Sequence, residues 1–424
     1  MDHVIGLRCL VCGRRYRPDE IEYVCPEHGA EGIVDVEYDY DVIGARASPP
    51  RLGGEPGMWR YRSLLPVEVW SEPPPLVVGG TPLVAAPRLA GEIAVAEVWV
   101  KDEGRQPTAS LKDRASAMAV VKAAERGIDT ITTASTGNAA AALAGMCAAA
   151  GRRAVIFVPA SAPKGKVAQL LAYGANVILV DGTYDEAFEM SMGAASSTGW
   201  YNRNTGFNPY MSEGKKTVVF EVCEQLAWSA PDVIAVGVGD GCIIGGLHKG
   251  LRDLVALGWI DHMPRLIGVQ AEGSAFLAEA WWSGEDVLTK APIRTYTVAD
   301  SISAGLPRDR LKAMAAVVET GGAFVTVSDE QILQAIPDMA RGCGVFGEPA
   351  AAAAWAGMRI AAGSRLVGPA DRVVVLSTGN GLKDAGAAVR ASELVQSTVL
   401  RVPPGRDGLN HAMRRLQPMT AETR

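Results

Sequence analysis

The sequence predicts an α/β protein whose parallel strands are covered by helices on both faces. Short, nearly continuous apolar segments alternate with longer helical patterns along most of the chain. Strands of this composition are buried on both faces, as in parallel sheets with helical crossovers. The 424 residues, of which 48% are apolar and 21% charged, predict a soluble chain of two or three domains with a large core.

The expected elements begin with a segment of paired cysteines at residues 1–40, followed by a connector rich in Pro and Gly. Within the connector, the apolar and aromatic segment Met58–Leu65 is expected to pack on the body of the protein. Strands are expected at Val98–Lys101, Thr130–Thr133, Ala154–Val158, Asn176–Val180, Val233–Val238, Arg265–Gln270, Ala323–Val327 and Val373–Leu376. Ligands of parallel sheets bind at the carboxyl ends of the strands, so the residues that follow these strands are the candidate site.

Lys112 has the most distinctive surroundings in the chain, the sequence KDEGRQPTASLKDR from Lys101 to Arg114. A strand ends there, a Pro/Thr/Ser turn follows, and a helix is expected to begin near Lys112. Ligands with phosphate groups dock at such junctions, and a lysine presented there can form a Schiff base. Asp102 and Glu103 are interpreted as solvated charges beside the turn.

Three further junctions carry small polar residues and glycines after a strand. They are Thr132–Asn138 (TTASTGN), Gly239–Ile243 (GDGCI) and Ser377–Asp384 (STGNGLKD). Hydroxyls and free backbone N–H groups at such positions converge on anions, although each segment alone also fits ordinary turn and N-cap chemistry. Gly237 and Gly239 begin a dinucleotide-binding GxGxxG pattern, but Cys242 replaces its third glycine, which argues against that interpretation.

Together these motifs resemble the threonine synthase group of pyridoxal-phosphate (PLP) enzymes, which have fold type II, the fold of the tryptophan synthase β subunit. The resemblance runs from Gly79–Leu83 (GGTPL) to about Asp384, includes Gly344–Ala350 (GVFGEPA), and keeps the family's order of motifs. It implies PLP as the cofactor and an amino acid as the substrate. We expect a large PLP-binding α/β domain at residues 41–114 and 201–410, a small mobile α/β domain at residues 115–200, and a tail at residues 411–424.

The resemblance implies a role for each motif. Lys112 would bind PLP as a Schiff base and then remove the α-proton of the substrate. The substrate carboxylate would be bound by Ser135, Thr136, Gly137 and Asn138, with Asn138 also at the ring hydroxyl of the cofactor. The cofactor phosphate would be held by backbone N–H groups of Gly239, Asp240, Gly241, Cys242 and Ile243. Thr378, with Ser377 as the second choice, would meet the pyridine nitrogen, where a hydroxyl favours elimination and replacement over transamination.

The segment Asn208–Gly214 departs from the family at the position that binds the substrate phosphate. The family's arginine falls on Met211, and a thioether cannot replace a guanidinium on phosphate. Asp240 also replaces a neutral residue of the family's phosphate loop. Candidates to compensate for Met211 are Arg203, Lys215 and Lys216, and candidates for other substrate contacts are Ser301, Ser303 and Arg308.

The favoured activity is the conversion of O-phosphohomoserine to threonine, by elimination and replacement at the β or γ carbon of the activated amino acid. Two alternatives stay open: β-replacement on O-phosphoserine, as in the related cysteate synthase, and dehydration of threonine or serine. A pseudoenzyme with a binding or regulatory role is the non-enzymatic alternative. The intact Lys112, Asn138 and Thr378 count against it.

The first cysteines have the spacing of a metal site. Cys9 and Cys12 are followed, after twelve residues, by Cys25 and His28. Four such ligands on two turns suit tetrahedral Zn²⁺, and because they close the coordination sphere the metal would be structural rather than catalytic. Threonine synthase relatives often carry an N-terminal ribbon of paired cysteines. A ribbon that folds without metal is the alternative.

Charge and hydropathy indicate where in the cell the protein is expected and which kinds of partner it is not expected to bind. The net charge of −6 and the pI near 5.6 leave no basic field for nucleic acid. The longest apolar run, Ala139–Ala150, is about half of the roughly 20 residues that a membrane span needs, and no signal peptide is visible. We therefore expect a cytoplasmic protein with reduced cysteines, no membrane or nucleic-acid partner and, from family habit, a homodimer.

Overall fold

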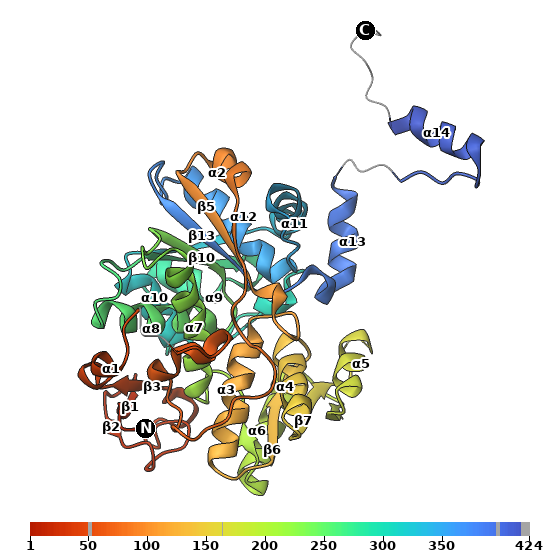
Figure 1. Cartoon of the computed structure of the whole chain (residues 1–424). Helices are drawn as coiled ribbons and strands as arrows, with labels where there is room; N and C mark the ends of the chain where they lie inside the picture. The colour runs from red at the N-terminus through yellow and green to blue at the C-terminus, as the bar shows by residue number, and fades with distance from the viewer. Residues whose placement is uncertain (50–52, 163, 396–398, 417–424) are drawn as a thin grey trace.

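Two mainly parallel sheets form the centre of the protein, and a small antiparallel sheet lies near the N-terminus (Figure 1). The computed structural model describes residues 1–49, 53–162, 164–395 and 399–416. The larger sheet has the order β12 (Ala323–Val327), β11 (Arg265–Ala271), β10 (Val233–Gly237), β13 (Arg372–Ser377), β5 (Glu97–Asp102) and β4 (Leu83–Ala85). The smaller sheet has the order β8 (Asn176–Val180), β7 (Arg153–Pro159), β6 (Thr130–Ala134) and β9 (Tyr201–Asn202). The antiparallel sheet has the order β2 (Arg15–Tyr16), β1 (Val4–Cys9) and β3 (Val34–Tyr38).

Every strand predicted from the sequence is present at its predicted place, and the α/β fold class is confirmed. The pairings within the two central sheets are parallel, except that β4 runs antiparallel to β5. β4 and β9 are additional strands of three and two residues. Segments this short show no apolar periodicity, so the sequence pattern could not identify them.

Helices cover both faces of the larger sheet. α8 (Cys242–Ala256) and α10 (Arg310–Glu319) pack on one face, and α12 (Pro349–Gly363) packs on the other. Consecutive residues of β10 alternate between the two cores, with Ile234 on the first side and Val233 on the second. The other helices of this part are α1 (Tyr40–Arg46), α2 (Pro87–Ile93), α7 (Tyr210–Gln225), α9 (Phe276–Ser283), α11 (Asp329–Cys343) and α13 (Ala385–Glu393).

The smaller sheet is surrounded by four helices and lies in the lower part of Figure 1. They are α3 (Lys112–Glu125), α4 (Asn138–Ala149), α5 (Lys164–Ala172) and α6 (Tyr184–Thr198). α3 and α4 each begin directly after a strand-to-helix junction that the sequence had singled out. α8 does the same after β10. The candidate residues therefore lie at the carboxyl ends of parallel strands, where ligands of such sheets bind.

A buried ion cluster ties β5 to α3 and α7. Arg114 donates to both carboxylate oxygens of Glu103, at 2.7 and 2.8 Å, and to those of Glu221, also at 2.7 and 2.8 Å. Lys101 donates to Glu221 at 2.8 Å. Interpreting Asp102 and Glu103 as solvated charges was wrong, because both are buried and Glu103 is 0% exposed. The cluster balances its charges, which makes burial of these groups possible.

The N-terminal segment packs against α7, α8 and α10. Tyr38 donates to Glu213 of α7, Tyr40 donates to Asp253 of α8 at 2.7 Å, and Lys312 of α10 pairs with Asp35 at 2.9 Å. The segment expected to pack on the body forms the 3₁₀ helix η3 (Gly57–Leu64), and its Met58, Trp59, Tyr61 and Leu64 are buried. The N-terminal segment is therefore part of the folded body.

The C-terminal region ends in α14 (Arg406–Leu416), which Figure 1 shows away from the body. The tail predicted at residues 411–424 thus begins inside a helix, and residues 417–424 lie outside the described part. Among the residues that are described, no helix is both long and apolar enough to cross a membrane.

Candidate active site

Lys112 is held beside the end of β13 by backbone hydrogen bonds. Leu111 donates its N–H to the carbonyl of Thr378 at 2.9 Å, and Asn380 donates to the carbonyl of Ala109 at 3.0 Å. Ala109 has the left-handed φ of +67°, a conformation that costs a non-glycine residue about 1 kcal/mol. The turn is closed further by Thr108, whose N–H and hydroxyl both donate to the Asp113 carboxylate. Lys112 follows this hydrogen-bonded turn and is the first residue of α3.

The segment Ser135–Asn138 leads into the N-terminus of α4. Gly137 donates its N–H to the Ser135 hydroxyl at 3.1 Å, and the helix has no side-chain cap. Uncapped N–H groups at a helix start favour an anion. Asn138, the first residue of the helix, donates its side-chain N–H to Glu348 at 2.6 Å.

The segment Gly239–Ile243 forms a narrow turn at the start of α8. A Cβ on Gly239 would lie 2.8 Å from the Cα of Ile302, and one on Gly241 would lie 2.7 Å from the Cβ of Ala313. Only glycine fits at these two places, and Gly241 also has a φ of +87°. Asp240 accepts the N–H of Arg308 at 3.3 Å through a carboxylate oxygen. This contact directs the acidic side chain toward the Arg308 backbone.

One cavity brings together most of the predicted residues. It has a volume of about 830 Å³, and its lining includes Lys112, Ser135, Thr136, Gly137, Asn138, Asp240 and Cys242. A small adjoining cavity is lined by Lys112 and by the whole turn from Gly239 to Ile243. Ser301 lines both, and Ser303 and Arg308 line the larger one. Thr378 is in neither lining, and its carbonyl accepts the N–H of Leu111, the residue before Lys112.

Comparison with known proteins identifies the kind of enzyme to which this geometry belongs. The sequence profile described as pyridoxal-phosphate dependent enzyme matches residues 75–379. The chain belongs to this family. It is 39% identical over 390 residues to the threonine synthase of Methanocaldococcus jannaschii, covering 91% of this chain and 95% of that protein. The threonine synthase of Methanosarcina acetivorans is 40% identical over 389 residues, which cover 91% of this chain and 94% of that protein.

Solved structures of PLP enzymes share the fold. Threonine deaminase isoform 2 of Solanum lycopersicum, in its processed form, has a TM-score of 0.64 and 22% identity and covers 75% of this chain and 88% of its own. A fungal L-serine ammonia-lyase from Rhizomucor miehei has a TM-score of 0.63 and 22% identity, with 74% and 97% covered. Both are fold type II PLP enzymes, so the predicted PLP fold is confirmed.

The residues around Lys112 fit the cofactor of the PLP family. The glycine turn leaves room for backbone N–H groups to approach a phosphate, and the uncapped start of α4 suits a second anion. The hydroxyl of Ser377, at the end of β13, is fully buried and has no hydrogen-bond partner among the described residues. Ser377 lines none of the described cavities around Lys112, and its oxygen would lie 3.2 Å from a Cβ on Gly347. Thr378 therefore stays the first candidate for the pyridine nitrogen and Ser377 the second.

Glu348, which accepts the hydrogen bond of Asn138, is a residue beside the candidate site that the sequence analysis did not single out. It is buried at the start of α12, and burial raises the pKa of its carboxyl to about 7, against the lowering effects of the Asn138 hydrogen bond and of Lys383 and Lys112. Glu348 belongs to the segment Gly344–Ala350 (GVFGEPA), which carries the family resemblance without assigning a role to this carboxyl. The Glu348 carboxyl can therefore hold or release a proton near neutral pH, and it lies beside Asn138, the residue expected at the ring hydroxyl of the cofactor.

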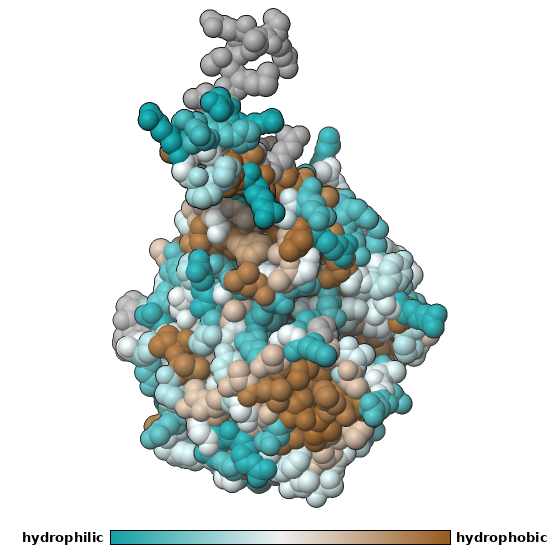
Figure 2. Space-filling model, turned by 90° about the vertical axis from the view of Figure 1, so that its right-hand side faces the viewer, coloured by the Kyte–Doolittle hydropathy of each residue, from teal (hydrophilic) through white to brown (hydrophobic). Residues whose placement is uncertain are grey.

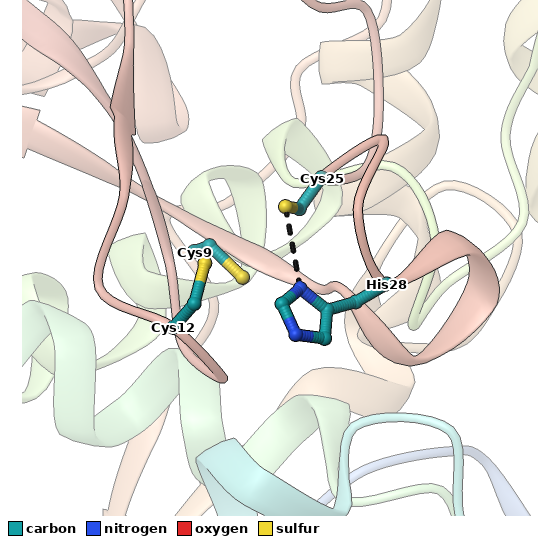
Figure 3. A group of neighbouring side chains, drawn as sticks. All are labelled: Cys9, Cys12, Cys25 and His28. Carbon is teal, nitrogen blue, oxygen red and sulfur yellow. Dashed lines mark hydrogen bonds between the residues drawn. The ribbon is translucent and has the colours of Figure 1, made fainter.

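The predicted metal ligands lie together in the N-terminal segment. The ligand atoms of Cys9, Cys12, Cys25 and His28 are all within 4.8 Å of one another (Figure 3). Burial would raise the pKa of the Cys25 thiol, but hydrogen bonds with His28 and Tyr16 and from the backbone lower it to about 6. A thiolate is the form that binds zinc. Atoms bound to one Zn²⁺ lie within about 4 Å of each other, so this donor set fits a tetrahedral ion after small side-chain shifts.

Proposed function

We propose that this protein is a threonine synthase that converts O-phosphohomoserine to threonine. The similarity to proteins named threonine synthase, 39–40% identical over 91% of the chain, carries the proposal. The geometry around Lys112 supports it, because a lysine, a phosphate cradle and a carboxylate site share one cavity system.

In this proposal the chain's own residues bind and orient the cofactor and the substrate. PLP, when bound, supplies an electron sink that stabilises negative charge at the substrate carbons. The turn Gly239–Ile243 holds its phosphate, Ser377 or Thr378 faces its ring nitrogen, and Asn138 faces its ring hydroxyl. The segment Ser135–Asn138 binds the substrate carboxylate. The Lys112 amine then removes and returns protons at the substrate carbons.

Met211 supports a second candidate function. It is fully buried in the core and offers no charge at the position of the family's phosphate-binding arginine. A phosphate on a shorter side chain, as in O-phosphoserine, would reach a different part of the cavity. β-Replacement on that substrate is the alternative.

The test is to mix the holoenzyme separately with O-phosphohomoserine, O-phosphoserine, threonine and serine, and to follow phosphate, keto acid and amino-acid products. Phosphate release with formation of threonine from O-phosphohomoserine is the expected result. Turnover of O-phosphoserine alone would support the alternative, and keto acid from threonine or serine would indicate a dehydratase. No turnover of any of these by PLP-loaded protein would support the pseudoenzyme.

We also propose that residues 115–200 move against the rest of the chain when substrate binds. Two ion pairs join α5 and α6 to the opposite wall of the cavity: Lys166 with Asp300 at 2.5 Å, and Asp185 with Arg308 at 3.5 Å. Partly exposed pairs of this kind each contribute about 1 kcal/mol or less. Such contacts can form and break as a cleft closes and opens.

Three further features complete the proposal: a structural zinc ion bound by Cys9, Cys12, Cys25 and His28, a cytoplasmic location, and a homodimer. Exposed apolar side chains, among them Leu171 and Leu179, support an interface between subunits. Figure 2 looks at the side of the molecule that carries α5 and shows a broad apolar area in its lower half. Light scattering on the purified holoenzyme tests the dimer, whose expected mass is twice that of the 44.6 kDa chain.

A further inference from the structure

Arg203 is a buried cation beside the cavity. It is 1% exposed and lines the cavity that contains Lys112. Its Nε donates to the Ser116 hydroxyl at 3.1 Å and its Nη1 donates to the Thr205 hydroxyl at 3.2 Å. Its Nη2 is buried without a partner among the described residues. A guanidinium in this state has the geometry to bind an anion, and none of the described carboxylates forms an ion pair with it.

Lys215 is a second buried cation of the same kind. It is 0% exposed, and the one hydrogen bond found for its ammonium in the described chain goes to Thr205, at 3.5 Å. Burial lowers the pKa of Lys215 to about 8, and the charges of Lys112 and Arg203 act in the same direction. Cys242 and Asp309 oppose this shift. Asp309 forms no ion pair with Lys215 in the described structure.

Other buried cations of the chain are neutralised. Lys216 pairs with Asp253 at 2.6 Å and also with Glu213, Lys249 pairs with Asp253, and Lys312 pairs with Asp35. Arg114 and Lys101 share Glu103 and Glu221. Burying an ion without a partner costs several kcal/mol. Lys216 therefore already has its counter-ions, whereas Arg203 and Lys215 form no ion pair with any of the described residues.

The position of the two cations points to a ligand of the active site. α7 and α8 pack so closely that a Cβ on Gly246 would lie 3.1 Å from the Cβ of Lys215. Cys242 is the first residue of α8, and the helix dipole at this end of α8 favours anions. Thr205, which both cations contact, lines the cavity together with Lys112 and Cys242. Arg203 and Thr205 therefore belong to the wall of the cavity that contains Lys112, and Lys215 is joined to this wall through its contact with Thr205.

We infer that Arg203, Lys215 and the Thr205 hydroxyl bind a phosphate monoester dianion, taking over the role that Met211 cannot perform. The inference rests on the proposed function, in which the dianion is the leaving phosphate of the substrate. The cofactor also carries a phosphate monoester, and the turn Gly239–Ile243 already provides its cradle. We therefore assign the subsite to the substrate.

The first experiment measures phosphate binding without turnover. The melting temperature is measured for the wild-type holoenzyme and for its Lys215→Met and Arg203→Gln variants. Each protein is in a buffer free of multivalent anions, with inorganic phosphate added from 0 to about 50 mM. A ligand that binds only the folded state raises the melting temperature with its concentration. The wild type is expected to gain stability, and both variants to lose most of this gain. Lys290→Met, which changes an ion-paired lysine outside the cavity, is expected to respond like the wild type.

The second experiment distinguishes the two phosphate sources. The variants are expected to keep wild-type affinity for PLP, measured by titration of cofactor-free protein, and to raise the KM for O-phosphohomoserine by about 10- to 100-fold, as expected for loss of a charge-assisted contact. Weaker PLP binding with an unchanged KM would transfer the subsite to the cofactor and overturn the assignment to the substrate. An equal response of wild type and variants to inorganic phosphate would overturn the subsite itself. If phosphate binding depends on Lys215 but O-phosphohomoserine does not react, the subsite stands and the proposed function fails.

Discussion

Asn138 donates a 2.6 Å hydrogen bond to the buried carboxyl of Glu348. The contact joins the start of α4, beside the smaller sheet, to the start of α12, beside the larger one. Both residues line a third cavity, of about 420 Å³, whose lining also includes Lys383. An amide N–H can donate to a carboxylate or to the carbonyl oxygen of a carboxylic acid. The pair therefore persists while Glu348 changes its charge.

Glu348 is expected to make the stability of the cofactor-free protein fall as pH rises from about 4.5 to 7. Burial raises its pKa from 4.5 to about 7 in the folded protein. Between these pH values the folded state binds more protons than the unfolded state, so the free energy of unfolding falls as pH rises. Above pH 7 the folded protein bears the full free-energy cost of burying the ionised Glu348 carboxylate. Glu348→Gln removes this dependence and is expected to gain on the order of 3 kcal/mol relative to wild type between pH 4.5 and 8. Urea unfolding at both pH values measures it, with the exposed Glu393→Gln as control; parallel pH profiles for wild type and Glu348→Gln would contradict the prediction.

Lys112→Ala is expected to remove the visible absorbance of the bound cofactor and to lower activity by about 10³-fold or more, as for loss of a residue that reacts covalently. Lys290→Ala changes a lysine outside the cavity and should keep both properties. Absorption spectra of the variants after incubation with PLP and gel filtration provide the measurement. A visible spectrum in Lys112→Ala that is indistinguishable from wild type would remove Lys112 from its assigned role.

The sequence predicted the strands and the junction motifs because both are local. A run such as Val373–Leu376 is apolar wherever it lies, and glycines at Gly239 and Gly241 report a close backbone approach without further context. The ion cluster could not be predicted in this way. Arg114 and Glu221 are 107 residues apart and meet only after α3 packs on α7. Because the sequence does not show that Arg114 pairs with Glu103, the sequence alone suggests that Glu103 is a surface charge.

The same limit applies to the polar parts of the site. Met211 in the sequence indicates that the family's phosphate-binding charge is missing at this position. Arg203, Lys215 and Lys216 are equally good candidates to replace that charge when only the sequence is considered. Their partners distinguish them, since Asp253 of α8 pairs with Lys216, whereas no carboxylate in the described part of the chain pairs with Arg203 or Lys215. Glu348 was likewise visible only as part of a motif. Its altered pKa follows from burial, which a motif does not report.

Arg114→Met is expected to destabilise the protein by about 3–5 kcal/mol, because it leaves the buried Glu103 and Glu221 without their shared partner. The matched control is Arg105→Met. Its exposed side chain contacts Asp102 at 3.2 Å, and its loss should cost about 1 kcal/mol or less. Chemical denaturation of both variants at pH 7 gives the comparison. Equal midpoints for the two would mean that the buried cluster does not contribute as proposed.

We expect about one zinc ion per chain, bound by Cys9, Cys12, Cys25 and His28. Loss of this zinc should weaken substrate binding more than it weakens PLP binding. Tyr23 lies two residues before Cys25 in the chain. Its hydroxyl accepts the N–H of Asn202 at 3.0 Å, and its ring lies 4.9 Å from that of Phe207. Asn202 and Phe207 flank Arg203 and Thr205.

Metal loss would release the loop that carries Tyr23, and with it one support of the segment that holds the phosphate subsite. Cys25→Ser is therefore expected to lose the metal, to melt at a lower temperature and to raise the KM for O-phosphohomoserine while PLP absorbance stays near the wild-type level. Cys343→Ser, outside the cluster, should change none of these. Elemental analysis, thermal melts and kinetics on the same preparations make the measurement. Wild-type protein that contains no zinc, yet melts and reacts like protein supplied with zinc, would show that the N-terminal segment folds without metal.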